Sequence, residues 1–310
     1  LLGFQPEGEG EHLLLHLRKR NTNTVWLAKQ LARFAGIPQR DVGYAGLKDR
    51  NAVTSQWFSV RLPVTRELDW SGLESDEIQL LEAVRHRRKL RRGALARNRF
   101  HLRLRDFVGD TDEVERRLQQ IYTQGIPNYF GEQRFGHSGN NLEMADSLSR
   151  GELKKVARHQ RGIYLSAARS YLFNLVLAQR VEHGNWNLAV AGDCMQLDGR
   201  GSLFPVVEVD ETIHHRAADL DIHPTGPLWG KGEQQATGAV AGMEQQILEA
   251  YPEWLEGLVR LGLSLDRRAL RARVIGLRWH WPAAGELELE FELNPGSYAT
   301  MVLREIIVAR

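Results

Sequence analysis

The chain has 310 residues, of which 42% are hydrophobic and 26% are charged, and its formal net charge is +2. These values are typical of a packed, soluble protein, and the length fits one large domain or two ordinary ones. The small net charge excludes any argument for a polyanion ligand from bulk charge alone.

The single cysteine, Cys194, excludes an internal disulfide and a zinc cluster built on paired cysteines, which fits a reducing cytoplasm. No apolar run is long enough to span a bilayer, so we expect no membrane partner. Because the first residue is Leu1 and not Met, we expect the natural N-terminus to lie upstream. We therefore expect a cytoplasmic protein, and we expect it to be a monomer.

The N-terminal third predicts strands and one helix. Residues 11–18 read as a strand that leads into an Asn- and Thr-rich run, whose side chains can cap a helix over 25–34. Residues 41–51 contain GYAGLKDRN and are too rich in turn residues for a regular element. Residues 56–62 alternate in polarity, which predicts a second strand.

Residues 85–105 read RHRRKLRRGALARNRFHLRLR and contain ten Lys or Arg residues and no acid. Phe100, Leu102 and Leu104 alternate with polar residues, which predicts a half-buried strand with arginines on its wet face. Solvated faces ordinarily mix charges of both signs, so the missing acids favour a nucleic acid or another polyanion as ligand. Lys and Arg would then contact phosphates, and Phe100 and Asn98 could engage an unpaired base.

The rest of the chain predicts helices in the middle and strands near the end. The predicted elements are helices over 112–122, 166–180 and 244–263, short strands around a turn at 198–199, strands over 270–281 and 286–293, and a helix from 301. Residues 128–141 read as a glycine- and asparagine-rich loop, and 211–228 as looser structure. This change of character suggests a core that is interrupted by an insertion.

Asp49 is the candidate catalytic residue of the glycine-punctuated loop. A lone Asp in such a loop is more often a turn former. Its neighbours Lys48 and Arg50 would keep the carboxylate ionised, however, and an ionised carboxylate beside a basic track could act as nucleophile or base on a flipped nucleotide. The sequence matches no Walker loop or nucleophile elbow, and the adjacent His214 and His215 would point apart, which argues against a metal site there.

Several blocks of the chain resemble one known family. Residues 45–58, AGLKDRNAVTSQWF, resemble the signature of the TruD family of tRNA pseudouridine synthases. The resemblance continues, in family order, in HRRKLRRGALARNRF at 86–100, PNYFGEQRFG at 127–136, LSAARSYLFN at 165–174 and PGSYATMVLRE at 295–305. It spans nearly the whole chain, and several such blocks together are far more specific than one.

The resemblance implies an isomerase that converts uridine to pseudouridine, typically at position 13 of a tRNA, without a cofactor or a metal. It places the catalytic aspartate on Asp49 and an active-site asparagine on Asn98, two residues before an aromatic at Phe100. The family's ring-stacking phenylalanine falls on Tyr298, a departure that keeps the stacking face and adds a hydroxyl. We expect Lys48 and Arg50 to contact the substrate, and a tRNA track to consist of Arg85, Arg87, Arg88, Lys89, Arg91 and Arg92.

A second departure concerns the start of the chain. The family carries a lysine and a D-F-x-V-x-E-type motif in an N-terminal segment, and this chain begins just after that point. We therefore expect the basic partner of Asp49 and one substrate-contacting phenylalanine to lie outside the sequence. The role of the aspartate, attack on C1′ or proton abstraction, stays open at this stage.

The resemblance also implies an architecture. We expect an α+β pseudouridine synthase core, with a mixed, mainly antiparallel sheet and a central cleft, formed by residues 1–123 and 272–310. A family-specific insertion domain would occupy 124–271. Asp49, Asn98 and Tyr298, which are far apart in sequence, would then converge in the cleft between core and insertion.

Two rival functions come from other classes. The first is a non-catalytic tRNA-binding protein that keeps the fold and has lost turnover, against which the intact Lys48-Asp49-Arg50 set argues. The second is an RNA hydrolase, for which paired carboxylates or a metal cluster would be expected, and the sequence offers neither.

Overall fold

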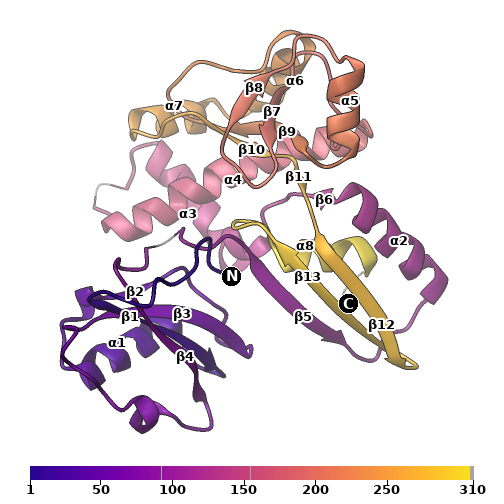
Figure 1. Ribbon diagram of the computed structural model, residues 1–310. Coiled ribbons are helices and arrows are strands. Elements are labelled where there is room, and N and C mark those ends of the chain that lie inside the picture. The colour runs from indigo at the N-terminus through magenta and orange to yellow at the C-terminus, as the bar shows by residue number, and fades with distance from the viewer. Residues whose placement is uncertain (92, 154, 308–310) are drawn as a thin grey trace. The chain divides into compact units, whose positions relative to one another are not determined.

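The computed structural model describes residues 1–307 except 92 and 154. The chain forms two compact units, Leu1–Asn98 and Arg99–Arg310 (Figure 1). Each combines a sheet with helices, and the paired strands are mainly antiparallel. The predicted α+β class is therefore confirmed.

The first unit is built on one four-stranded antiparallel sheet in the order β2-β3-β1-β4. Its strands are β1 (His12–Lys19), β2 (Val42–Tyr44), β3 (Thr54–Arg61) and β4 (Ile78–His86), and its short 3-10 turns are η1 (Gln39–Asp41) and η2 (Trp70–Leu73). Helix α1 (Thr24–Ala35) buries Leu27 and Leu31 in a common core with Leu15 and Leu17 of β1 and Phe58 of β3. The alternation of β1 and β3 thus produces one face that the helix covers.

The predicted start of α1 is confirmed in detail. The Asn23 carboxamide oxygen accepts hydrogen bonds from the backbone N–H groups of Val25, at 2.8 Å, and Trp26, at 3.3 Å, which satisfies two donors that the helix leaves open. Gly36 ends the helix in a left-handed conformation, with φ of 61°. Strand β4 was not foreseen: it lies at the edge of the sheet and exposes many of its positions, so its apolar alternation is weak.

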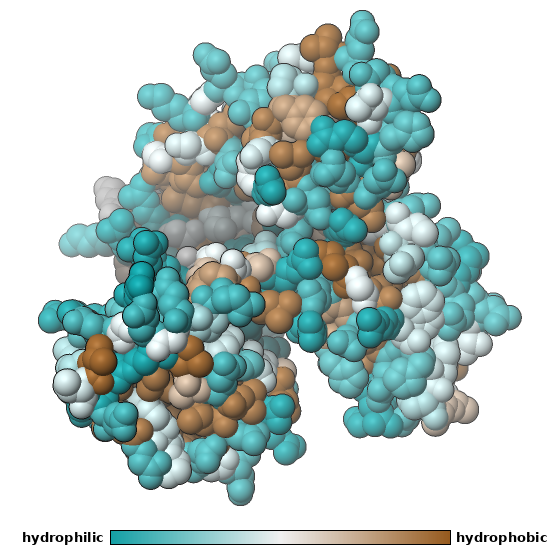
Figure 2. Space-filling view, viewed as in Figure 1, coloured by the Kyte–Doolittle hydropathy of each residue, from teal (hydrophilic) through white to brown (hydrophobic). Residues whose placement is uncertain are grey.

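One part of the second unit is a three-stranded sheet in the order β12-β13-β5, with helices α2 and α8 packed in the same core. The elements are β5 (Asn98–Leu104), α2 (Thr111–Gln124), β12 (Ile275–Ala283), β13 (Glu286–Leu293) and α8 (Ala299–Ile306). The ELELEFEL pattern of β13 places Leu287, Leu289, Phe291 and Leu293 in this core, as predicted. The outward surface of α2 is mostly hydrophilic (Figure 2), as an amphipathic helix requires.

The remainder of the second unit is organised around a long helix, α4 (Arg158–Glu182), and a four-stranded sheet in the order β10-β9-β7-β8. Its other elements are β6 (Ile126–Pro127), η3 (Glu132–Arg134), η4 (His137–Gly139), α3 (Asn140–Ser149), β7 (Cys194–Leu197), β8 (Leu203–Pro205), α5 (Glu211–Ala218), β9 (Ile222–Leu228), α6 (Gly238–Leu248), α7 (Pro252–Arg260), β10 (Asp266–Ala269) and β11 (Arg271–Ala272). Helices α3, α4, α6 and α7 share one hydrophobic core.

Two sequence predictions in this part are wrong. Residues 211–228 were expected to be irregular, but they form α5, capped by the Asp210 carboxylate, and the buried strand β9. The prolines at 224 and 227 disguise this strand because proline removes a backbone donor and is rare inside sheets. The predicted helix over 244–263 is two helices, since Pro252 cannot continue a helix and instead occupies the first turn of α7.

The hydrophobic clusters of the second unit separate into two groups. The first group is a single cluster of residues from 114–126 and 272–306. The second group contains three clusters, whose residues lie mostly within 129–270. The expected domain boundaries, 1–123 with 272–310 and 124–271, stay a prediction. The convergence of Asp49 with Tyr298 likewise stays a prediction, because the two residues belong to different compact units.

Candidate active site

Asp49 lies in the loop that joins β2 to β3 in the first unit, and its side chain is exposed. The loop is fastened at two points. The Gln56 carboxamide donates to the carbonyl oxygen of Gly46 at 2.7 Å, and the backbone N–H of Lys48 donates to the hydroxyl of Thr24 at 3.1 Å. Thr24 and Gln56 are buried and bonded to each other, so the loop is held by the interior of the unit.

Lys19, at the end of β1, supplies a buried positive charge beside Asp49. Its ammonium donates to the backbone carbonyl of Asp49 at 2.9 Å and to that of Thr22 at 2.6 Å, and the residue is only 1% exposed. Burial lowers the pKa of Lys19 from its ordinary value, and the charge of Asp49 opposes that change. The Lys19 ammonium therefore holds the backbone of the loop at Asp49.

Sequence reasoning missed Lys19, and the expectation of a basic partner outside the sequence stays a prediction. A signal was available in the sequence, because Lys19 occupies the same phase of β1 as the buried residues Leu15 and Leu17. A lysine on the buried phase of a strand needs a partner, and such a residue is a candidate for function. Arg50, by contrast, donates its Nε–H to the backbone carbonyl of Asn21 at 3.3 Å.

Asn98 is the second predicted site residue that the first unit brings to this loop. The Lys48 ammonium donates a hydrogen bond to the Asn98 carboxamide oxygen, which joins two predicted positions separated by 50 residues. Burial lowers the pKa of Lys48, and the nearby charge of Lys19 lowers it further. Lys48, Asp49, Asn98 and Lys19 therefore form one polar cluster in the first unit.

The basic segment divides according to the partners of its cations. Arg85 donates to the backbone carbonyls of Leu62 and Arg66, each at 2.9 Å, so it holds a neighbouring loop. Arg87 forms ion pairs with Glu9 and Glu7. These two residues are therefore engaged with the first unit itself. Arg92 lies outside the described residues.

Arg88, Lys89 and Arg91 are exposed, and of these Lys89 donates to the backbone carbonyl of Arg40. Lys89 and Arg91 line a groove of about 600 Å³ together with Arg40 and Tyr44, and no carboxylate occurs among the described residues of its lining. Gly43 allows this segment to pack closely against the sheet, because a β-carbon there would lie 2.3 Å from the carbonyl oxygen of Leu90. The groove is consequently a fixed, positively charged surface.

The second half of the basic segment lies on β5 and is neutralised by β13. Arg99 pairs with Glu292 at 2.7 Å, and Arg103 pairs with Glu286 at 2.5 Å. His101 lies 3.5 Å from Glu288. The cations that looked unaccompanied in the sequence thus meet the acids of a strand almost 200 residues away, and they contribute less to an anion-binding surface than Arg88 and its neighbours.

Tyr298 immediately precedes α8 in the second unit, where two of the family-like blocks meet. The Arg134 guanidinium donates to the Tyr298 hydroxyl oxygen at 2.9 Å, and the ring of Phe130 meets that of Tyr298 edge-on at 6.3 Å. The Arg268 guanidinium lies over the Phe130 ring, 4.1 Å from its centroid. Burial lowers the pKa of Arg268 to about 10, and the charge of Arg134 adds to this effect.

The backbone around Phe130 is fixed by α4. The Asn174 carboxamide accepts from the N–H of Phe130 and donates to its carbonyl oxygen, each at 2.9 Å. Sequence reasoning missed Arg134, Arg268 and Asn174 as supports of Tyr298, although 134 and 174 fall within the family-like blocks. Phe100 lies half-buried on β5, with its ring 5.4 Å from that of Phe291, so it belongs to the core of that sheet.

The comparisons with known proteins identify the family. The family model described as tRNA pseudouridine synthase D (TruD) matches residues 2–160 and 140–306. A tRNA pseudouridine synthase D of Methylococcus capsulatus is 50% identical over 307 residues, which cover 99% of this chain and 87% of the relative, and one of Nitrosococcus oceani is 49% identical over 308 residues. The chain therefore belongs to the TruD family of tRNA pseudouridine synthases, which are isomerases.

A solved structure supports the fold. The crystal structure of a protein from Methanosarcina mazei that carries the family name TruD superposes with a TM-score of 0.72 at 21% identity, and the match covers 99% of this chain and 90% of that one. In the part of the chain that the structure describes, no helix is long and apolar enough to cross a membrane. The same residues contain no group of three or more His, Cys, Asp or Glu side chains placed to hold a metal ion.

Proposed function

We propose that this chain isomerises uridine to pseudouridine in tRNA, at position 13, with Asp49 as the catalytic carboxylate and without a cofactor. The observation that carries the proposal is the exposed Asp49 carboxylate on a loop fastened by Thr24, Gln56 and the buried Lys19. This loop contains the block that resembles the family signature, and the family membership of the whole chain supports the same reaction.

The reaction needs one broken bond and one new bond on the same sugar. The bond from C1′ to N1 of uracil breaks, the base rotates, and C1′ bonds to C5, while the C5 proton leaves and N1 gains a proton. Asp49 acts on the ribose, either as a nucleophile at C1′ or as a base toward a sugar proton, and both roles require the ionised form. The buried Lys19 ammonium supports this role by holding the backbone carbonyl of Asp49, which fixes the loop that carries the carboxylate.

The detached base must be held while it rotates. In this proposal Tyr298 stacks on the uracil, and Asn98 and Lys48 offer polar groups to its edge. Base–aromatic stacking contributes about 1–3 kcal/mol per base. Extruding a nucleotide costs a few kcal/mol, and contacts to the tRNA backbone offset that cost.

We assign the backbone contacts mainly to Arg88, Lys89 and Arg91. They are exposed next to a groove without carboxylates among its described lining residues. Arg85 and Arg87 belong to the predicted track as well. Their hydrogen bonds and ion pairs within the first unit make them less available to contact phosphates. Substrate contacts by Arg50, Arg92 and Phe100 stay predictions, as do the cytoplasmic location and the monomeric state.

Tritium release tests the proposal. Purified protein is incubated with tRNA that carries tritium at C5 of uridine, and the modified position is mapped afterwards. Isomerisation releases the label as each C5 bonds to C1′, and the mapped pseudouridine should lie at position 13. If the protein binds this tRNA and releases no label, it is a non-catalytic tRNA-binding protein; pseudouridine elsewhere would overturn the assigned position.

A further inference from the structure

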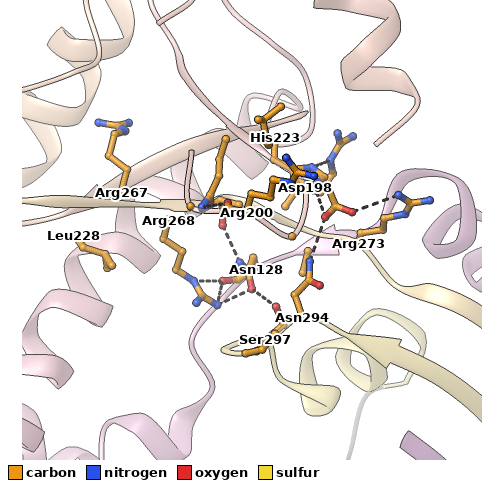
Figure 3. Close-up of a pocket in the computed structure, with 18 residues that line it drawn as sticks. Asn128, Asp198, Arg200, His223, Leu228, Arg267, Arg268, Arg273, Asn294 and Ser297 are labelled. Carbon is orange, nitrogen blue, oxygen red and sulfur yellow. Dashed lines mark hydrogen bonds and ion pairs between the residues drawn. The ribbon is translucent and has the colours of Figure 1, made fainter. Parts of the chain in front are cut away.

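A second cationic cavity lies in the second unit. It has a volume of about 340 Å³ and is formed by the ends of β6, β7, β9, β10, β11 and β13 and the loops that follow them (Figure 3). Five arginines line it, at 200, 267, 268, 271 and 273, whereas Asp198 is the one carboxylate among its described lining residues.

Two of these arginines are used to hold the fold. Arg267 forms a buried ion pair with Glu244 at 2.5 Å, and its side chain points away from those of Arg268 and Arg273 in Figure 3. Arg271 donates to His223 Nδ1 at 2.9 Å and to the carbonyl oxygens of Ala217 and Ile222. Because these donors are already satisfied inside the protein, neither arginine is needed for a ligand.

Asp198 is also committed to neighbours within the cavity wall. It accepts from His223 Nε2 at 3.1 Å, from the Asn294 carboxamide at 3.2 Å and from Arg273 at 3.3 Å. Burial lowers the pKa of His223, which keeps the imidazole neutral with one nitrogen donating to Asp198 and the other accepting from Arg271. Two of these partners are neutral, so Asp198 compensates the charge of Arg273 and not that of the other lining arginines.

Arg200 and Arg268 are lining arginines that no carboxylate of the described lining neutralises. The Arg200 guanidinium is exposed on the turn between β7 and β8 and has no hydrogen bond or ion pair within the described residues. Arg268 donates to neutral oxygens of Asn128 and Gly296, through Nη2 at 2.6 Å and 2.9 Å. Its pKa is lowered to about 10, first by burial, as expected for a half-enclosed cation that lacks an acid.

The arginine-rich lining of the cavity favours an anionic ligand. Like charges that line one cavity attract a counter-ion, and guanidinium groups match the oxygens of a phosphate. The described lining offers no Trp, Tyr or Phe side chain on which a base could stack, and the one imidazole has both nitrogens occupied. A phosphate group fits these donors better than a base does.

We propose that this cavity is a second phosphate-binding site for the RNA backbone, in which Arg200 and Arg268 contact the phosphate. The proposal rests on the tRNA substrate of the proposed function. It also connects binding to the site residue Tyr298, because the carbonyl oxygen of Gly296, two residues before Tyr298, accepts from Arg268. A phosphate held by Arg268 would fix the loop from which Tyr298 projects.

Replacement of Arg200 tests the site with the least structural damage. Arg200→Ala should weaken tRNA binding, and the slope of log affinity against log salt should fall by about one, the value for one lost phosphate contact. Arg200→Glu should weaken binding further. Arg278→Ala is the matched control, because it removes the same charge from an exposed position on β12 that lies outside the cavity. Melting curves of all variants check the fold.

Inorganic phosphate separates two sources of the same ligand chemistry. Phosphate should raise the Tm of the wild-type protein more than chloride at equal ionic strength, and Arg200→Ala should reduce this difference. If phosphate stabilises the protein but Arg200→Ala leaves the tRNA salt slope unchanged, the site takes free anions and the RNA assignment is overturned. An unchanged slope without phosphate stabilisation removes the site altogether.

The outcome is independent of catalysis. Affinities can be measured on the Asp49→Asn protein, in which the proposed function predicts strongly slowed turnover. Failure of the wild-type protein to release tritium would overturn the proposed isomerisation, while the salt slopes would still decide the phosphate site. Conversely, normal tritium release with unchanged slopes would overturn only the phosphate site.

Discussion

The Asp49 loop of the first unit and the Tyr298 cluster of the second unit differ in their charged groups. Asp49 is an exposed carboxylate beside the buried Lys19, and hydrogen bonds with Lys19, Thr24 and Gln56 hold its loop. Tyr298 and Phe130 are aromatic rings beside Arg134 and Arg268, and no carboxylate contacts those two arginines within the described residues. In the proposed function the first region acts on the ribose, whereas the second holds the base and a phosphate.

The largest expected effect follows from the carboxylate. Asp49→Asn keeps the size of the side chain and removes its charge, so it should slow isomerisation by at least about 10³-fold, within the range seen when an acid–base group is lost. The affinity for tRNA should stay within a few-fold of wild type. Single-turnover tritium release and filter binding measure the two quantities, and wild-type-like release by this variant would remove Asp49 from the mechanism.

The next largest effect concerns the positioning residue Lys19. Lys19→Met keeps a long apolar chain and removes the hydrogen bonds to the carbonyls of Asp49 and Thr22. Hydrogen bonds from charged groups contribute about 1.5–3 kcal/mol, so the single-turnover rate should fall by about one to two decades. Lys29→Met on the exposed face of α1 is the control and should leave the rate unchanged.

A purely structural role for Lys19 predicts a different result. The melting temperature would then fall while the rate of the folded protein at lower temperature stayed at the wild-type value. A lowered rate with retained tRNA affinity in a folded protein supports the positioning role, because a change in general stability does not by itself separate rate from binding.

Tyr298 tests the other side of the comparison. Tyr298→Phe retains the ring and should keep most activity, while Tyr298→Ala should lose about one to two decades in binding or rate, as expected for 1–3 kcal/mol of stacking. Tyr122→Ala on the exposed face of α2 is the control. An inactive Phe variant would instead show that the hydroxyl, which accepts from Arg134, is required to place the ring.

The smallest expected effect compares two arginines of one basic segment. Arg88→Ala should reduce the slope of log tRNA affinity against log salt by about one, since Arg88 is exposed in the track. Arg103→Ala should leave the slope unchanged, because Arg103 pairs with Glu286 on β13. Equal losses for the two variants would contradict the division of the segment by its acid partners.

The sequence by itself determined the family, the α+β class and most local structure. The AGLKDRNAVTSQWF block placed Asp49, the ELELEFEL alternation specified β13, and Asn23 marked the start of α1. These features depend on short-range spacing, so they can be recognised without knowledge of the fold. The local pattern did not predict strand β9, because this strand contains prolines, which are rare inside sheets.

The tertiary structure alone decided which residues meet. Lys19 and Asp49 are 30 residues apart, Tyr298 and Arg134 are separated by 164, and Arg103 and Glu286 by 183. No local pattern encodes such pairs, because they result from strand order and from the return of the chain after a long excursion. For the same reason the run of ten cations overstated the basic surface: its acid partners lie far away in the sequence and become neighbours only when the sheet forms.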